Sequence, residues 1–151
     1  MKIDDLPLTI ETKNPDDTFQ LAVHFAKLTG PGDVVLLHGP LGAGKTLFVR
    51  GLCSGLGLKD LWQVDSPTYT IVNHYAVGDG IDHLDLYRLG GSDELEEIGF
   101  HDMLEQPSLK VIEWPERLND YDLECPVFLV SFNVIGENDR TIRVSHEEAA
   151  A

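Results

Sequence analysis

The sequence predicts an α/β fold in three layers, with a mixed central sheet flanked by helices on both sides. Two observations lead to this prediction. In the first half of the chain, strand-like apolar runs alternate with helical patterns, which is typical of parallel strands joined by helices. In the later part, strand-like runs follow one another across short turns, which is typical of antiparallel hairpins.

The first two predicted elements are a short strand over 8–12 and a helix that begins at Pro15. Asn14 can cap this helix, proline fits its first turn, and the acids at 16 and 17 favour its positive end. Four residues at helical spacing predict its apolar face: Phe19, Ala22, Val23 and Ala26.

The remaining elements follow from apolar runs and turn residues. Residues 33–38 read DVVLLH, a continuous apolar run typical of a strand buried on both faces. A helix from 45 to about 52 comes after a glycine-rich loop. The other predicted elements are strands at 69–77 and 81–86, an acidic helix at 93–98, and strands at 109–113, 127–135 and 140–144.

The length and composition fit one domain. The chain has 151 residues, 42% of them apolar, which predicts a single domain over 1–145 and a frayed tail over 146–151. No apolar run approaches the roughly 18 residues of a membrane span, and the N-terminus MKIDDLPLT has no signal-peptide core. We therefore expect a cytoplasmic protein with no membrane contact. Cys53 and Cys125 lie outside any CxxC or His/Cys cluster, which predicts reduced thiols and no structural zinc.

Acidic residues dominate the charge. The chain has 26 Asp and Glu against 11 Lys and Arg, a net charge of −15. Binding a nucleic-acid backbone needs several cations on one face, and the bases here are scattered along the chain. Direct, tight binding of nucleic acid by this chain alone is therefore not expected. An acidic surface suits either solubility or docking on a basic partner, and composition does not separate the two.

The glycine-rich loop is the strongest motif. Residues 39–46 read GPLGAGKT and match the pattern G-x-x-x-x-G-K-[ST] between a strand and a helix. Glycines let the backbone wrap around phosphate, and the helix N-terminus adds partial positive charge. Lys45 is expected to reach the β- and γ-phosphates, and the Thr46 hydroxyl to coordinate Mg²⁺. This pattern predicts a P-loop NTPase-like domain whose nucleotide contacts come from Gly39, Pro40, Leu41, Gly42, Ala43, Gly44, Lys45, Thr46 and Leu47.

Two carboxylates could complete such a site. Asp85 and Glu113 each end an apolar run, and the carboxyl ends of parallel strands are where α/β sheets bind ligands. Either acid could bind the metal or position a nucleophile. The alternative for each is a solvated surface charge. His83 and Asp85 alternate onto one face of a strand, but two residues are too few for a transition-metal site.

The segment 66–70, reading SPTYT, lies between the loop's helix and the next strand. In nucleotide switches a loop at this place offers a hydroxyl to Mg²⁺ or the γ-phosphate. The alternative is a proline-stiffened entry to the strand.

Four blocks taken together resemble the TsaE (YjeE) family, bacterial ATPases needed to make tRNA N6-threonylcarbamoyladenosine (t6A37). They are HGPLGAGKT (38–46), SPTYTIVNHY (66–75), HLDLYRL with DELEEIGF (83–100), and VIEWPERL (111–118). The resemblance implies an ATP-hydrolysing subunit that uses ATP and Mg²⁺. It implies weak activity alone, stimulation by partner proteins TsaB and TsaD, and contact with tRNA only through that complex.

The resemblance also implies roles for individual residues. Lys45 and Thr46 correspond to the Walker A pair, and the segment containing Thr68 to the first switch region. Asp85 corresponds to the Walker B-type acid near Mg²⁺, and Glu113 to the acid at the metal that hydrolysis needs.

Trp114 is implied to lie beside the nucleotide, and Thr18 to flank the adenine. The chain departs from the family pattern at two positions. The family commonly has Asp where this chain has Pro40, and often a second Thr where it has Leu47. The lysine and the first threonine are retained, so nucleotide binding is still expected.

Two other functions are open. A small-molecule or nucleotide kinase needs an acceptor pocket and usually an arginine-bearing lid, whereas the five arginines here form no lid-like cluster. A regulatory NTP switch would be the third reading. The guanine-reading string NKxD is absent, which favours ATP over GTP. The acidic segment 93–97 is either a docking face or a plain solvated helix.

Overall fold

The computed structural model describes residues 1–67, 71–90, 92–118, 121 and 123–148. Its strands are β1 Leu8–Thr12, β2 Val34–His38, β3 Val72–Tyr75, β4 Ile81–Asp85, β5 Leu109–Glu113, β6 Val127–Val134 and β7 Arg140–Glu147. Its α-helices are α1 Pro15–Phe25, α2 Lys45–Gly55, α3 Ser92–Glu97 and α4 Phe100–Leu104. No helix among the described residues is long and apolar enough to cross a bilayer.

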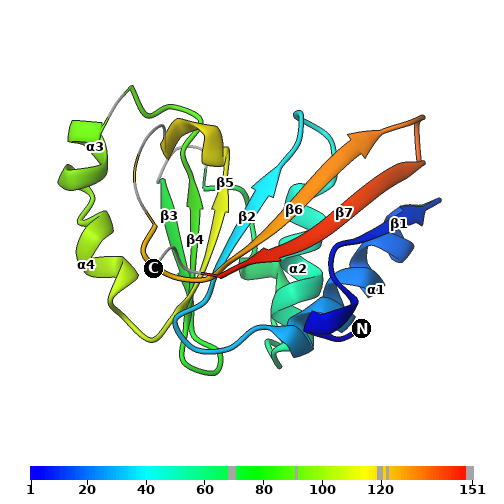
Figure 1. Cartoon of the computed structure of the whole chain (residues 1–151), viewed down its shortest axis with the longest axis horizontal. Helices are drawn as coiled ribbons and strands as arrows, with labels where there is room; N and C mark the ends of the chain where they lie inside the picture. Colours follow the sequence, from blue (N-terminus) through cyan, green and yellow to red (C-terminus); the bar gives the residue numbers. More distant parts are fainter. Residues whose placement is uncertain (68–70, 91, 119–120, 122, 149–151) are drawn as a thin grey trace.

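The described strands form one seven-stranded sheet in the order β1-β7-β6-β2-β5-β4-β3. The four central strands β6, β2, β5 and β4 are parallel, whereas β3 pairs antiparallel with β4, and β7 pairs antiparallel with both β6 and β1. In Figure 1, α1 and α2 lie beside one part of this sheet and α3 and α4 beside the other. The predicted α/β fold with a mixed sheet is confirmed.

Each sheet face carries its own apolar core. On one face, Phe25 of α1 packs between Phe48 of α2 and Phe128 of β6, with ring centroids 5.5 and 5.2 Å apart. On the other face, Leu95 of α3 and Phe100 of α4 pack with Leu84 and Ile112, among others. Side chains alternate between the faces along each strand. The helices that flank the sheet therefore complete three layers.

Helix α1 begins as predicted but turns a different face inward. Asn14 accepts a hydrogen bond from the Asp17 backbone N–H at 2.9 Å, which confirms the cap. The predicted apolar face was partly wrong, because Phe19 and Val23 are only half-buried. The buried residues of the helix are Thr18, Leu21, Ala22 and Phe25. Periodicity gives the width of an apolar stripe, and the position of α2 beside the helix decides which part of it is covered.

Other elements also differ from the prediction, among them β3, which spans Val72–Tyr75 where a strand at 69–77 was predicted. Helix α4 was not predicted, because its five residues are too few for a helical period to be recognised. Strand β7 continues to Glu147, so the expectation of a frayed tail from 146 is corrected for its first two residues. His146 packs its ring on Phe128 with centroids 4.5 Å apart, and this contact keeps the end of the strand on the sheet.

Candidate nucleotide-binding site

The glycine-rich loop connects β2 to α2 at the carboxyl edge of the parallel strands. Gly42 and Gly44 have φ values of +77° and +104°, a left-handed backbone that favours glycine. Gly39 serves a different purpose, because a Cβ there would lie 2.9 Å from Cβ of Phe132. The loop thus curls tightly where α2 begins, and the first backbone N–H groups of that helix have no partner inside the helix.

Lys45 is held close to the loop. The side chain is buried, its Nζ donates a hydrogen bond to the carbonyl of Gly39 at 2.7 Å, and it lies 4.0 Å from the ring centroid of Trp114. Burial lowers the pKa of Lys45, and the nearby Glu113 and Asp85 carboxylates oppose this shift. Trp114 has a φ of +59°, a rare conformation for a bulky residue.

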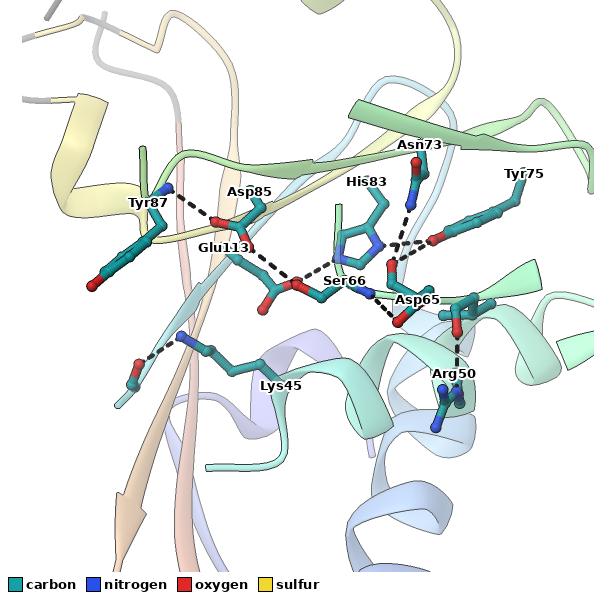
Figure 2. A network of polar contacts seen from close by, with 12 residues as sticks. Lys45, Arg50, Asp65, Ser66, Asn73, Tyr75, His83, Asp85, Tyr87 and Glu113 are labelled. Atoms are coloured by element: carbon teal, nitrogen blue, oxygen red, sulfur yellow. Dashed lines mark hydrogen bonds and ion pairs between the residues drawn. The ribbon is translucent and has the colours of Figure 1, made fainter. Parts of the chain in front are cut away.

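Asp85 and Glu113 lie side by side. They end β4 and β5, two parallel neighbours in which these residues are paired in register. Their exposed fractions are 5% and 3%, which excludes the alternative of solvated surface charges. Asp85 accepts hydrogen bonds from the Ser66 hydroxyl at 3.1 Å and from the Tyr87 backbone N–H at 2.9 Å. Figure 2 shows both acids beside Lys45.

The Glu113 carboxylate contacts a buried histidine. His83 Nε2 lies 2.6 Å from Glu113 Oε2, and the His83 side chain is fully buried. On its other side, His83 Nδ1 lies 2.9 Å from the hydroxyl of Tyr75. Alternation along the strands places His83, Asp85 and Glu113 on the sheet face that α2 covers. These acids therefore point towards the helix that follows the glycine loop.

Between the loop and the two acids is a cavity of about 560 Å³. The hydroxyl-bearing Thr46 and Ser66 and the carboxylate-bearing Asp85 and Glu113 line it, and such hard oxygen donors are the ones that Mg²⁺ prefers. No group of three or more His, Cys, Asp or Glu in metal-binding geometry occurs in the described part of the chain. The residues around the cavity are Leu41, Gly42, Gly44, Lys45, Thr46, Leu47, Ser66, Asp85, Tyr87, Glu113 and Trp114.

Most of the predicted site residues are thus brought together, with five exceptions. Gly39, Pro40 and Ala43 belong to the loop but do not line the cavity. Thr68 lies outside the described residues. Thr18 is buried and donates a hydrogen bond to the Thr12 hydroxyl at 3.0 Å. It lines a separate hollow of about 60 Å³, which shares Gly44 and Leu47 with the main cavity.

Sequence reasoning missed four residues that support the site. Tyr87, on the turn after β4, packs against Trp114 with ring centroids 4.9 Å apart and the ring planes tilted by 50°. Arg140, at the start of β7, donates to the carbonyls of Ala43 and Gly42 at 3.1 and 3.2 Å. The other two are His83 and Tyr75. The alternation of His83 with Asp85 was visible in the sequence, but its partner became visible only with the strand order.

The fold and the loop define the class: a three-layer α/β domain of the P-loop NTPase type, with carboxylates at the same edge of its sheet. The chain belongs to the TsaE family, because the family model "Threonylcarbamoyl adenosine biosynthesis protein TsaE" matches residues 12–143. The match covers all four sequence blocks on which the resemblance rested.

Individual relatives agree with this assignment. The chain is 37% identical to the tRNA threonylcarbamoyladenosine biosynthesis protein TsaE of Aquifex aeolicus over 133 residues, which is 87% of this chain and 91% of that protein. It is 34% identical to the protein of the same name from Treponema pallidum over 136 residues, 89% of this chain and 97% of the relative. The crystal structure of Bacillus subtilis YdiB superposes with a TM-score of 0.73 at 28% identity, covering 91% of this chain and 84% of that one.

Proposed function

We propose that this chain binds ATP with Mg²⁺ and hydrolyses it as a subunit of the machinery that makes tRNA threonylcarbamoyladenosine. The family assignment supports the pathway. One observation supports the chemistry: Lys45, Thr46, Asp85 and Glu113 meet around one cavity beside a glycine-rich loop. Phosphoryl transfer depends mainly on positioning and on stabilising negative charge, and these four side chains supply both.

Each residue has a defined part in this proposal. The loop N–H groups and the Lys45 ammonium bind the phosphates. The Thr46 hydroxyl and the carboxylates of Asp85 and Glu113 hold Mg²⁺, directly or through water, and one of the carboxylates orients the attacking water. When bound, the metal neutralises charge on the phosphate oxygens. The rings of Tyr87 and Trp114 border the cavity and limit the access of bulk water.

The proposal extends to the base and to the partners. The hollow beside Thr18 adjoins the loop at Gly44, and we assign the adenine to that side. Partners of the TsaB and TsaD type are proposed because the family resemblance implies them. They would bring the chain to tRNA, which suits a net charge of −15. The cytoplasm is the compartment proposed for this work.

The test is ATP hydrolysis by the purified chain, alone and with TsaB and TsaD. We expect slow hydrolysis alone and a marked stimulation by the two partners. Transfer of phosphate to an added metabolite without stimulation would instead identify a kinase. Tight nucleotide binding with no hydrolysis in either setting would identify a regulatory switch.

Substitutions test the assignment of residues in the same assay. Asp85→Ala and Glu113→Ala should each lower kcat by about 100-fold or more while nucleotide still binds. Lys45→Ala should weaken nucleotide binding by about 10- to 100-fold, because a charge-assisted contact is lost. Lys59 and Asp79 are exposed, and their replacement by Ala provides the matched controls. An acid whose variant keeps the wild-type rate has no part in the reaction.

A further inference from the structure

The carboxylate of Glu113 is held by a series of three contacts, two between side chains and one to a backbone carbonyl. His83 Nε2 lies 2.6 Å from Glu113 Oε2, and His83 Nδ1 lies 2.9 Å from the Tyr75 hydroxyl. The same hydroxyl lies 3.3 Å from the backbone carbonyl of Asp65. Figure 2 shows this series of contacts passing from β5 through β4 and β3 to Asp65.

Both ring nitrogens of His83 have a partner. Nε2 faces the Glu113 carboxylate and Nδ1 faces the Tyr75 hydroxyl, and the ring's tautomer sets which atom donates in each contact. The Tyr75 hydroxyl also contacts the Asp65 carbonyl, which accepts a hydrogen bond from the Asn73 side-chain amide at 3.2 Å. One ring nitrogen of His83 is therefore committed to Glu113 and the other to Tyr75.

The burial of this pair argues against a simple packing role. His83 and Glu113 are 0% and 3% exposed. Apolar residues of similar volume usually stabilise a core as well as a buried polar pair does, since they cost no desolvation. What the histidine adds is a fixed rotation of the carboxylate, with one oxygen bound and the group held at the edge of the cavity.

Asp65, where this series of contacts ends, lies next to the residue that supports Asp85. Asp65 and Ser66 are adjacent, and the Ser66 hydroxyl donates to Asp85 Oδ2 at 3.1 Å. The Asp65 carbonyl contacts Tyr75. Both cavity carboxylates are thus supported from one two-residue segment. This segment is itself tied to α2, because Arg50 Nε donates to the carbonyl of Val64 at 3.2 Å.

We infer that His83 is a positioning residue, which orients Glu113 towards the metal and is itself oriented by Tyr75. The inference rests on the proposed function, since it concerns the metal side of the same cavity. Residues that orient metal-binding groups typically change metal affinity or activity about 10- to 100-fold when they are removed. The metal should therefore respond to His83, whereas binding of nucleotide without metal should not.

The test compares His83→Leu, His83→Gln and Tyr75→Phe. The main readout is binding of a fluorescent ATP analogue at increasing Mg²⁺ concentration, with ATP hydrolysis as the second. His83→Leu should raise the half-saturating Mg²⁺ concentration and lower kcat by about 10- to 100-fold. Its affinity for the analogue in the absence of Mg²⁺ should stay unchanged. His83→Gln should recover part of the loss, because an amide N–H can still reach Glu113.

Two matched controls test whether the effect is specific to His83, and a milder variant serves where His83→Leu does not fold. His146→Leu removes a partly buried histidine at the opposite end of the sheet, and Tyr121→Phe removes a hydroxyl whose partner is the exposed His101. Neither should change the Mg²⁺ requirement. If thermal unfolding shows that His83→Leu does not fold, Tyr75→Phe decides. It should raise the Mg²⁺ requirement several-fold without weakening metal-free binding.

The outcomes separate this inference from the proposed function. The inference alone is overturned when His83→Leu hydrolyses ATP at the wild-type rate and needs no more Mg²⁺ than the wild type. Where only Tyr75→Phe folds, the same result in that variant overturns it. Absence of hydrolysis in the wild type, with and without partners, overturns the proposed function. The Mg²⁺ titration would still decide the role of His83 in that case. Equal losses of metal-free and Mg²⁺-dependent binding would mean a structural role and also overturn the inference.

Discussion

The three charged side chains of the cavity are held by three different kinds of partner. Lys45 donates to the backbone carbonyl of Gly39, Asp85 accepts from a hydroxyl and a backbone N–H, and Glu113 is bound by an imidazole. A side chain that is already bound keeps its orientation before any ligand arrives. The geometry of the cavity therefore depends on residues well outside the glycine loop.

Cys53 gives a residue-scale prediction about pH. Burial in α2 raises the pKa of its thiol to about 12. The folded chain should hold Cys53 as an unreactive thiol at pH 8, while the unfolded chain ionises it near pH 8.5. The folded pKa is the higher one, so this thiol lowers stability as pH rises above about 8.5.

The measurement uses a Cys125→Ser variant, which leaves Cys53 as the single cysteine. A chromogenic disulfide reagent should find no reactive thiol at pH 8 in the folded protein and one thiol in denaturant. Reaction of the folded protein at the rate of a free thiol would contradict the burial of Cys53. The denaturant midpoint of the same variant should decrease between pH 8.5 and 10.5, and a constant midpoint would contradict the pKa argument.

At the same scale, the sequence was enough for some residues and not for others. Lys45 lies in a motif, and Asp85 and Glu113 end apolar runs, so the sequence alone identifies them. Neither kind of signal identifies His83 or Tyr75. Their partnership depends on β3, β4 and β5 being neighbours, and the order of strands is a property of the folded sheet.

At the scale of elements, the glycine loop is fixed from β7 as well as from its own strand and helix. Arg140, the first residue of β7, donates through Nε to Ala43 and through Nη2 to Gly42. It also donates through Nη1 to the carbonyl of Gly136 at 2.8 Å, within the turn that leads to its own strand. One guanidinium thus ties the β6–β7 turn to the loop.

This tie predicts that Arg140→Ala weakens ATP binding by about 5- to 30-fold, equivalent to about 1–2 kcal/mol, because the loop must then be ordered by the nucleotide. Isothermal titration calorimetry gives the affinity, and thermal unfolding checks the fold. Arg143→Ala is the matched control, since Arg143 lies on the same strand and is exposed. Equal affinities for the wild type and Arg140→Ala would show that the tie does not order the loop.

The elements themselves were mostly predictable because their signals are local. Strands β2 and β5 were recognised from apolar runs, and the start of α1 from its cap. What the sequence did not indicate was how elements meet. The inward face of α1 depends on α2, which approaches so closely that a Cβ on Gly51 would lie 2.4 Å from the carbonyl oxygen of Phe19.

For the whole molecule, charge limits what the protein can bind. The net charge is −15, and of the 11 bases, Lys45 and Lys110 are buried. Arg140 is committed to backbone carbonyls of the loop and the β6–β7 turn. The remaining eight bases are outnumbered by 26 acids. In the proposed function, Lys45 and the N–H groups of the glycine loop bind a small phosphate ligand, whereas an extended polyanion would meet the acidic surface.

We therefore predict that the chain alone does not bind tRNA measurably. Neutralising phosphates with Lys and Arg supplies essentially all non-specific affinity, and proteins that do so reach Kd values of about 10⁻⁴–10⁻⁶ M at physiological salt. Fluorescence anisotropy with labelled tRNA should give a Kd weaker than about 100 µM under those conditions. Stabilisation of the same sample by ADP and Mg²⁺ serves as the control for an active protein. Salt-sensitive binding in the low micromolar range would reveal a basic face, and tRNA contact would then not need a partner.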